Sequence, residues 1–217
     1  MDAAPYVADA LLKGARVSLL VAVQAGVLGL VIAIVVGALR EMANPLLRFA
    51  IRLYVEFFRG TSAFIQIYWA YFALPMLGVK LSALEAGVAV LALNIGAYGA
   101  EIVRGALAAV PRGQREACAA LGLPLWLSYV KVLIPQALAR AVLPFGNLMV
   151  DLLKGTALLS AITVTELTFA GRQVVSAIGH PFLVFGAVLC LYLIMAAPIA
   201  WGARMFDRRA RRWQSRA

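Results

Sequence analysis

Long runs of apolar residues, separated by short charged stretches, dominate the pattern along this chain. The run at 17–39 carries no charge. At about 1.5 Å per residue, a helix of that length crosses a hydrocarbon core about 30 Å thick. Similar runs, bounded by charged residues, Gly and Pro, predict about five membrane-spanning helices. We expect these helices at 16–39, 50–75, 82–107, 134–153 and 181–203.

The composition indicates that a bilayer solvates these runs. Of the 217 residues, 64% are hydrophobic and 14% are charged, and the mean hydropathy is +0.90. A water-soluble domain of this length could not bury so much apolar surface. The runs lack the alternation of barrel strands, and helices pair their own backbone groups within lipid. The sequence therefore predicts an all-α integral membrane protein with one domain, 1–217.

The positions of Lys and Arg predict the orientation of the chain. Of the 20 basic residues, fourteen lie in the loop 40–52, the stretch 104–140 and the C-terminal tail. By the positive-inside rule, this side faces the cytoplasm, so the C-terminus is cytoplasmic and the N-terminus is outside. The net charge of +10 is accounted for by this topology, which argues against nucleic acid as a partner. Five basic residues fall on the other side: Lys13, Arg16, Lys80, Lys154 and Arg172.

The residues that usually carry metal or redox chemistry are sparse. Cys118 and Cys190 are too few and too far apart for a metal or redox motif, and His180 is the only histidine. We expect no metal site, no catalytic residue and no nucleophile–base pair.

Ionisable residues inside predicted spans are expensive, and they are therefore candidates for function. Glu56 precedes Arg59 by three positions, and Glu101 precedes Arg104 by three, so each pair shares a helix face. One interpretation is a self-paired lock between helices, and the other is a polar lining of a translocation path. Gly60 and Gly105 fit either, because small residues allow helices to approach closely or a backbone to unwind.

Further polar residues are predicted near the outer parts of the second and fourth spans. Their mixed donors and acceptors suit a zwitterionic solute that has left water. Together with Glu56, Arg59 and Gly60, these residues make up the candidate translocation path. Its members are Glu56, Arg59, Gly60, Thr61, Ser62, Gln66, Asp151, Lys154, Thr156 and Glu166.

The segment 111–122 predicts a short helix on the cytoplasmic side. Pro111 suits a first helical turn, Gly122 suits a C-terminal stop, and Pro124 prevents continuation. A second helix is expected to start near Pro124 and to kink at Pro135. A short helix with one apolar stripe could dock in a groove of a partner or rest on lipid headgroups.

The chain resembles the membrane-spanning permease subunits of bacterial ABC importers, in the branch that takes up polar amino acids such as histidine, glutamine and arginine. The family loop is E-A-A-x3-G-x9-I-x-L-P. Here Glu116-Ala117-Cys118, Gly122 and Val132-x-Ile134-Pro135 stand at the same spacing. The stretches 55–75, 97–117 and 152–167 are also similar to this branch.

The resemblance implies a type I ABC importer transmembrane fold in the bacterial inner membrane, with 111–122 as the coupling helix. It also implies three partners: a cytoplasmic ATPase dimer, a second permease chain and an extracytoplasmic solute-binding protein. No G-x-x-x-x-G-K-[ST] phosphate loop occurs here, so ATP–Mg is expected in the separate ATPase, with no cofactor in this chain. The residues implied in coupling are Arg115, Glu116, Ala117, Leu121, Gly122 and Pro135.

One departure from the family bears on the substrate. Members often have N-E-x5-K-D-T where this chain has Asn147-Leu148 and then Lys154-Gly155-Thr156, although Asp151 can replace one lost acid. This favours a neutral, zwitterionic or acidic solute over a cationic amino acid, and a compatible solute such as ectoine also fits. The alternatives from other classes are a self-contained secondary transporter, for which no inverted repeat is detected, and a membrane enzyme.

Overall fold

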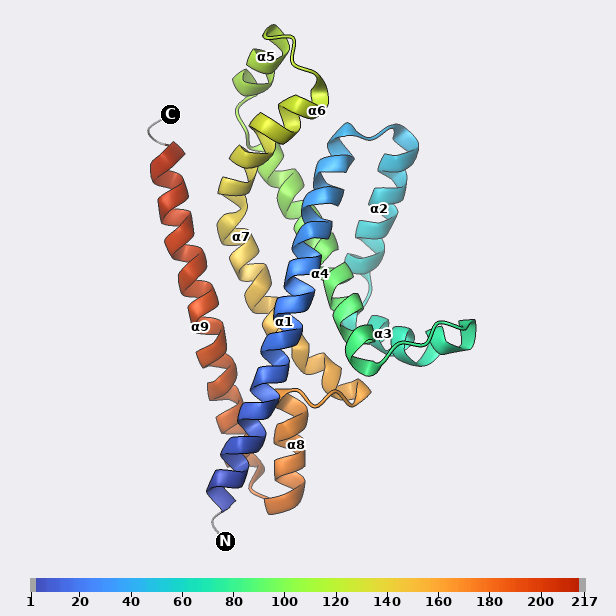
Figure 1. Ribbon diagram of the computed structural model, residues 1–217, viewed down its shortest axis with the longest axis vertical. Helices are drawn as coiled ribbons and strands as arrows, with labels where there is room; N and C mark the ends of the chain where they lie inside the picture. The colour runs from blue at the N-terminus through green and yellow to red at the C-terminus, as the bar shows by residue number, and fades with distance from the viewer. Residues whose placement is uncertain (1–2, 215–217) are drawn as a thin grey trace. The chain divides into compact units, whose positions relative to one another are not determined.

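The regular structure in the described part of the chain is helical throughout. The computed structural model describes residues 3–214, and the side chains of residues 5–209. The predicted all-α fold is confirmed, and no strand occurs within 3–214. The elements (Figure 1) are α1 Ala3–Met42, α2 Pro45–Gly60, α3 Ala63–Tyr68, η1 Trp69–Ala73, η2 Leu74–Leu77, α4 Ala83–Ala108, α5 Arg112–Ala120, α6 Leu125–Leu127, η3 Ser128–Leu133, α7 Ile134–Gly155, η4 Thr156–Ile162, α8 Leu167–Ile178 and α9 Pro181–Gln214.

Four helical segments of the described chain are long and apolar enough to cross a membrane: Pro5–Met42, Ala83–Ala108, Leu125–Ile162 and Pro181–Arg209. The predicted helix at 82–107 matches α4, and the one at 134–153 matches α7. The predicted span at 50–75 was wrong as a single helix. It consists of α2, which is 16 residues long, followed by α3 and the shorter turns η1 and η2.

The break after α2 has a local cause in the sequence Gly60-Thr61-Ser62. Ser62 adopts an extended conformation (φ −69°, ψ 125°) and directly precedes α3 as its N-cap residue. Gln66 reaches back from α3, and its Nε2 donates to the Thr61 hydroxyl at 2.6 Å. This bond satisfies polar groups at the break, where the regular helical pattern stops.

The first and last helices are longer than the apolar runs predicted. α1 begins well before residue 16, and an exposed pair in its first turns, Lys13 and Asp9 at 2.6 Å, stabilises a polar extension. α9 continues to Gln214, beyond the predicted end at 203. The side chains of Arg211 and Arg212, and all of Arg216, lie outside the described residues.

The described residues form two compact units. The first unit comprises the described residues of 1–27, 61–92 and 149–199, and the second those of 28–60, 93–148 and 200–217. Each unit draws on three separate stretches of sequence. The expectation of one permease domain over 1–217 stays a prediction.

The core of the first unit joins parts of α1, α7, α8 and α9. In Figure 1, α8 lies beside the first turns of α1, and Gly14 of α1 lies against Ala170 and Leu167 of α8. The buried residues of this core are Leu11, Ala15, Leu153, Leu167, Val188 and Met195.

The second unit depends on close packing between α1 and α4. Ala33 and Gly37, four residues apart on α1, face Gly99, Ala100 and Val103 of α4. A Cβ on Gly37 would lie 2.7 Å from the Val103 Cβ, and a Cβ on Gly99 would lie 2.5 Å from the Ala33 Cβ. Small residues at this spacing let helix backbones approach closely, which is how membrane helices gain packing energy.

We expect Gly99→Ala to destabilise the protein, because the new methyl group would meet Ala33 at 2.5 Å and the Phe145 ring at 3.0 Å. Overpacking of this kind costs about 1–3 kcal/mol of unfolding free energy. Gly105→Ala is the matched control on the same helix, because no atom lies within 4 Å of its Cβ position. The measurement is the thermal unfolding midpoint in detergent. Equal midpoints for the two variants would contradict the packing argument.

Candidate functional site

The predicted short helix is α5, which spans Arg112–Ala120 and is shorter than the predicted 111–122. Pro111 precedes the helix in an extended conformation (φ −54°, ψ 137°). At the other end, Leu123 N–H donates to the Cys118 carbonyl and Gly122 N–H donates to the Ala119 carbonyl, each at 3.0 Å. This pair of bonds is a Schellman motif, so the predicted glycine stop is present.

Gly122 adopts φ +64°, the left-handed conformation that disfavours any residue with a Cβ. No atom lies within 4 Å of the position that its Cβ would occupy. Backbone conformation, rather than crowding, therefore favours glycine here.

Side chains fasten α5 to the neighbouring helices of the second unit. Arg115 Nη2 donates to the Leu107 carbonyl at 3.1 Å, and Gln136 of α7 donates to Gln114 at 3.1 Å. Arg140 of α7 donates to the carbonyl of Ala109, just beyond the end of α4. Carbonyls at a helix C-terminus lack intrahelical partners, and cationic side chains suit them. α5 is thus held against the end of α4 and the start of α7.

The face around this helix is open and in part apolar. Glu116 and Ala117 are exposed, whereas Arg115 is half-buried. A hollow of about 450 Å³ borders α5 and is lined by Glu41, Ala108, Val110, Arg112, Arg115 and Glu116. Four exposed apolar residues follow α5 in the sequence, and we call them the α5–α6 patch. They are Leu121, Leu125, Trp126 and Val130, between 52% and 76% exposed.

The segment before Pro135 departs from α-helical geometry. The helix that begins after Pro124 becomes a π-helix over Ser128–Leu133, and α7 starts at Ile134. Proline offers no N–H for the helical ladder, which fits the expected irregularity at this position.

The candidate translocation residues are divided between the two units. Glu56, Arg59 and Gly60 belong to the second unit and are exposed. The remaining seven belong to the first unit, where Thr61, Ser62, Asp151 and Lys154 are exposed and Gln66, Thr156 and Glu166 are buried. Their role in translocation stays a prediction.

The two predicted ion pairs have different outcomes. Glu101 binds Arg104 at 2.8 Å, and it also binds Arg40, near the C-terminal end of α1, which the sequence spacing did not indicate. Within the described residues, Glu56 and Arg59 form no ion pair, and the Arg59 guanidinium lies 5.3 Å from the Tyr98 ring centroid. Asp151 and Lys154, which are both exposed, approach to 3.5 Å.

Glu166 is fully buried and caps α8. Its carboxylate accepts from the Phe169 N–H at 2.8 Å, the Thr168 N–H at 2.9 Å and the Tyr192 hydroxyl at 2.8 Å. The Ser18 hydroxyl of α1 is a fourth donor at 3.4 Å. In this arrangement the carboxylate holds α1, α8 and α9 together and does not contact solvent.

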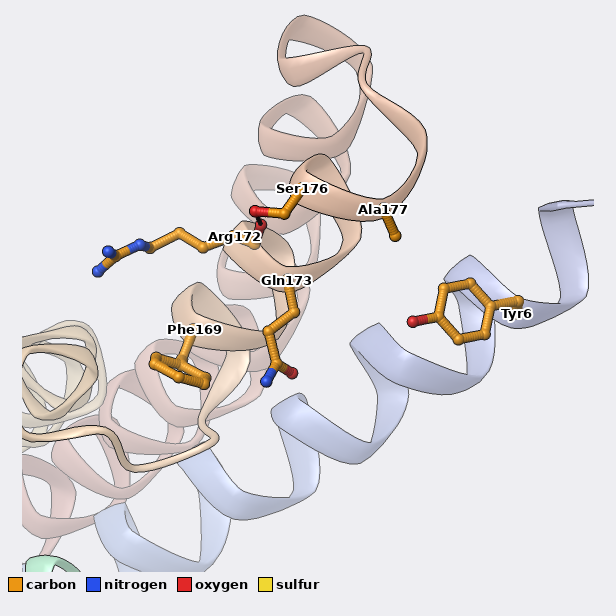
Figure 2. Close-up of a pocket in the computed structure, with 6 residues that line it drawn as sticks. All are labelled: Tyr6, Phe169, Arg172, Gln173, Ser176 and Ala177. Carbon is orange, nitrogen blue, oxygen red and sulfur yellow. Dashed lines mark hydrogen bonds between the residues drawn. The ribbon is translucent and has the colours of Figure 1, made fainter.

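A pocket of about 550 Å³ lies between α8 and the first turns of α1, lined by Tyr6, Phe169, Arg172, Gln173, Ser176 and Ala177. Figure 2 shows that Arg172 extends away from Tyr6, whereas Gln173 lies between the two helices. None of the predicted site residues lines this pocket. Within residues 3–214, no group of three or more His, Cys, Asp or Glu could hold a metal ion, and the expected lack of a metal site stays a prediction.

Comparison with known proteins assigns a family to this fold. The chain matches the family model described as "binding-protein-dependent transport system inner membrane component" over residues 27–212. It therefore belongs to that family and is a permease subunit of an ABC importer in the inner membrane. Membership implies an ATPase and a binding protein as partners.

Individual relatives agree with this family. The probable amino-acid ABC transporter permease protein y4tF of Sinorhizobium fredii is 36% identical, over 93% of this chain and 87% of that protein. The glutamine transport system permease protein GlnP of Escherichia coli is 34% identical, over 92% of each chain.

Solved structures share the fold as well. A crystal structure of an amino acid ABC transporter with histidines matches with a TM-score of 0.86 at 28% identity, over 96% of this chain and 99% of that one. An inward-facing MetNI methionine ABC transporter matches with a TM-score of 0.81 at 26% identity, over 93% and 96% of the two chains. The predicted type I ABC importer transmembrane fold is thus confirmed.

We expect Glu101→Gln to destabilise the protein, because it leaves the Arg40 guanidinium, whose side chain is only 17% exposed, without its carboxylate. Such a loss costs about 1–3 kcal/mol of unfolding free energy. Glu56→Gln is the matched control, because Glu56 is exposed and has no ion pair within the described residues. Thermal unfolding of both variants in detergent checks this. A midpoint for Glu101→Gln no lower than that of Glu56→Gln would contradict it.

Proposed function

We propose that this permease carries amino acids or similar small zwitterionic solutes, and that α5 couples it to the ATPase. The observation that supports the coupling role most is the structure of α5 itself, a short helix with a Schellman stop, fastened to α4 and α7 beside the exposed α5–α6 patch. An exposed apolar surface rimmed by charge suits a protein groove.

In this proposal the coupling residues divide into two tasks. Arg115 holds α5 to the carbonyl of Leu107, and Gly122 and Pro135 define where the helical segments stop and bend. Glu116, Ala117 and Leu121 are exposed and contact the ATPase. A rigid link of this kind passes a displacement of the docked helix to α4 and α7.

The coupling requires ATP and the loaded binding protein to stabilise different conformations of the permease. Each ligand shifts the balance between inward-open and outward-open states only through its different affinity for the two. ATP–Mg binds in a separate ATPase dimer, and a second permease chain, identical or paralogous, completes the path. An extracytoplasmic solute-binding protein delivers the solute.

The solute class is proposed from the names of the relatives and from residues of α7. The relatives include permeases named for amino acids and for glutamine. Asp151 is partly neutralised by Lys154 at 3.5 Å, and Leu148 stands where family members often have an acid. A path with so little net negative charge favours a neutral, zwitterionic or acidic solute over a cationic one. Ectoine is the alternative solute of the same kind.

We expect Gly122→Val to reduce ATP-driven uptake by about tenfold, because a β-branched residue at φ +64° costs at least 1–2 kcal/mol and disrupts the Schellman stop. Gly122→Asn is the matched control, because asparagine tolerates the left-handed conformation. Uptake and solute-stimulated ATPase activity are measured in the complete transporter, at equal levels of inserted permease. Normal uptake with Gly122→Val would count against the coupling role of α5.

We expect vesicles that contain the complete transporter to take up neutral or acidic amino acids in preference to arginine and lysine. Uptake should require ATP and should persist when the proton-motive force is collapsed. A preference for arginine or lysine would contradict the inference about charge. Uptake driven by the proton-motive force without ATP would instead support a secondary transporter, and ectoine as the best substrate would support the alternative solute.

A further inference from the structure

The C-terminal part of α9 has an arginine-lined hollow that none of the roles above uses. It measures about 310 Å³ and is lined by Trp201, Arg204, Met205, Arg208 and Arg209. These positions recur at three- and four-residue intervals and therefore share one face of the helix. The three arginines and Trp201 are exposed, and Met205 is half-buried. One face thus combines cationic groups with two apolar side chains.

The arginines of this hollow lack ion-pair partners in the described part of the chain. The ion pairs found there involve other residues, and none includes Arg204, Arg208 or Arg209. Asp207 lies in the same segment and offsets one of the three charges. The segment 204–209 therefore carries a formal net charge of +2, which attracts anions.

The position of the hollow along α9 places it at the edge of the bilayer. Residues 182–203 carry no charge and extend about 33 Å as a helix, slightly more than a hydrocarbon core about 30 Å thick. Arg204 is the first charged residue after this run. Trp201 lies one turn before it, and tryptophan is enriched where lipid headgroups meet the acyl chains.

We propose that this hollow binds the phosphate headgroup of an anionic phospholipid, with Arg204, Arg208 and Arg209 on the phosphate and Trp201 and Met205 against the upper acyl chains. Guanidinium groups bind phosphate oxygens through charge-assisted, often bidentate, hydrogen bonds. Clustered basic residues next to a membrane span attract anionic lipids through the surface potential. This site is separate from solute transport and from coupling, and it does not depend on either.

Charge and apolarity together favour a lipid over other occupants. A soluble phosphate would leave Trp201 and Met205 without an apolar partner. A second copy of this chain, docked through the same face about a two-fold axis, would bring identical arginines together. A phospholipid supplies both the anion and the hydrocarbon.

The test is lipid binding to the full chain, purified in detergent, followed by native mass spectrometry. Phosphatidylglycerol and phosphatidylcholine are titrated against the natural chain and the triple variant Arg204→Gln, Arg208→Gln, Arg209→Gln. The control triple variant Arg16→Gln, Lys80→Gln, Arg172→Gln removes three exposed basic residues elsewhere, and so lowers the net charge equally. Circular dichroism confirms that all the chains remain helical.

We expect the α9 triple variant to lose about tenfold in phosphatidylglycerol affinity with little change for phosphatidylcholine, and the control to lose less than about twofold. A variant with Lys at the three α9 positions should keep most of the affinity. Equal loss in both Gln triples would show that net charge alone is responsible and would overturn the site. Unchanged phosphatidylglycerol affinity of the α9 triple variant would overturn the site, and a smaller oligomer in the same spectra would indicate a second copy of this chain as the occupant instead.

Discussion

Inside a bilayer, every backbone N–H and C=O must find its hydrogen-bond partner within the protein, and most of this structure follows from that requirement. Long helices meet it over most of the chain. At helix ends, other groups pair the open backbone atoms. The Gln66 amide donates to the Thr61 carbonyl at 3.4 Å after α2, and Arg115, Arg140 and a Schellman motif act at the ends of α4 and α5, on the predicted cytoplasmic side. The residues proposed for coupling therefore also complete the backbone of the helices that they join.

How far the sequence predicted this fold depends on whether the signal was local. α4 and α7 were predicted within two residues, because charge, Gly and Pro mark their ends. The stop of α5 was also predicted, since Gly122 and Pro124 are local signals. The break within 50–75 was not predicted, because hydropathy averages over a turn and does not register a single extended residue such as Ser62. α8 is a mixed segment of only 12 residues and carried no comparable signal.

For the charged groups, too, a contact between neighbours in the sequence could be predicted, whereas contacts between distant residues could not. Spacing of three residues places Glu101 and Arg104 on one face, and they do pair. The same spacing in Glu56 and Arg59 gives no pair, because Tyr98 provides another partner for the guanidinium. Arg40 lies 61 positions from Glu101, and Arg140 lies 31 from Ala109. Contacts over such separations are decided by how helices pack, which a single sequence does not reveal.

The buried carboxylate of Glu166 also constrains the order in which the protein can be assembled. Ser18, 148 positions earlier in the sequence, is made long before it, and Tyr192 is made afterwards. While the ribosome has produced only the chain up to α8, the carboxylate lacks its tyrosine donor and cannot be buried with all its bonds. The packing of α1 against α8 therefore becomes complete only after α9 has entered the membrane. A protein truncated before α9 would leave the Glu166 carboxylate with three of its four donors at that helix junction.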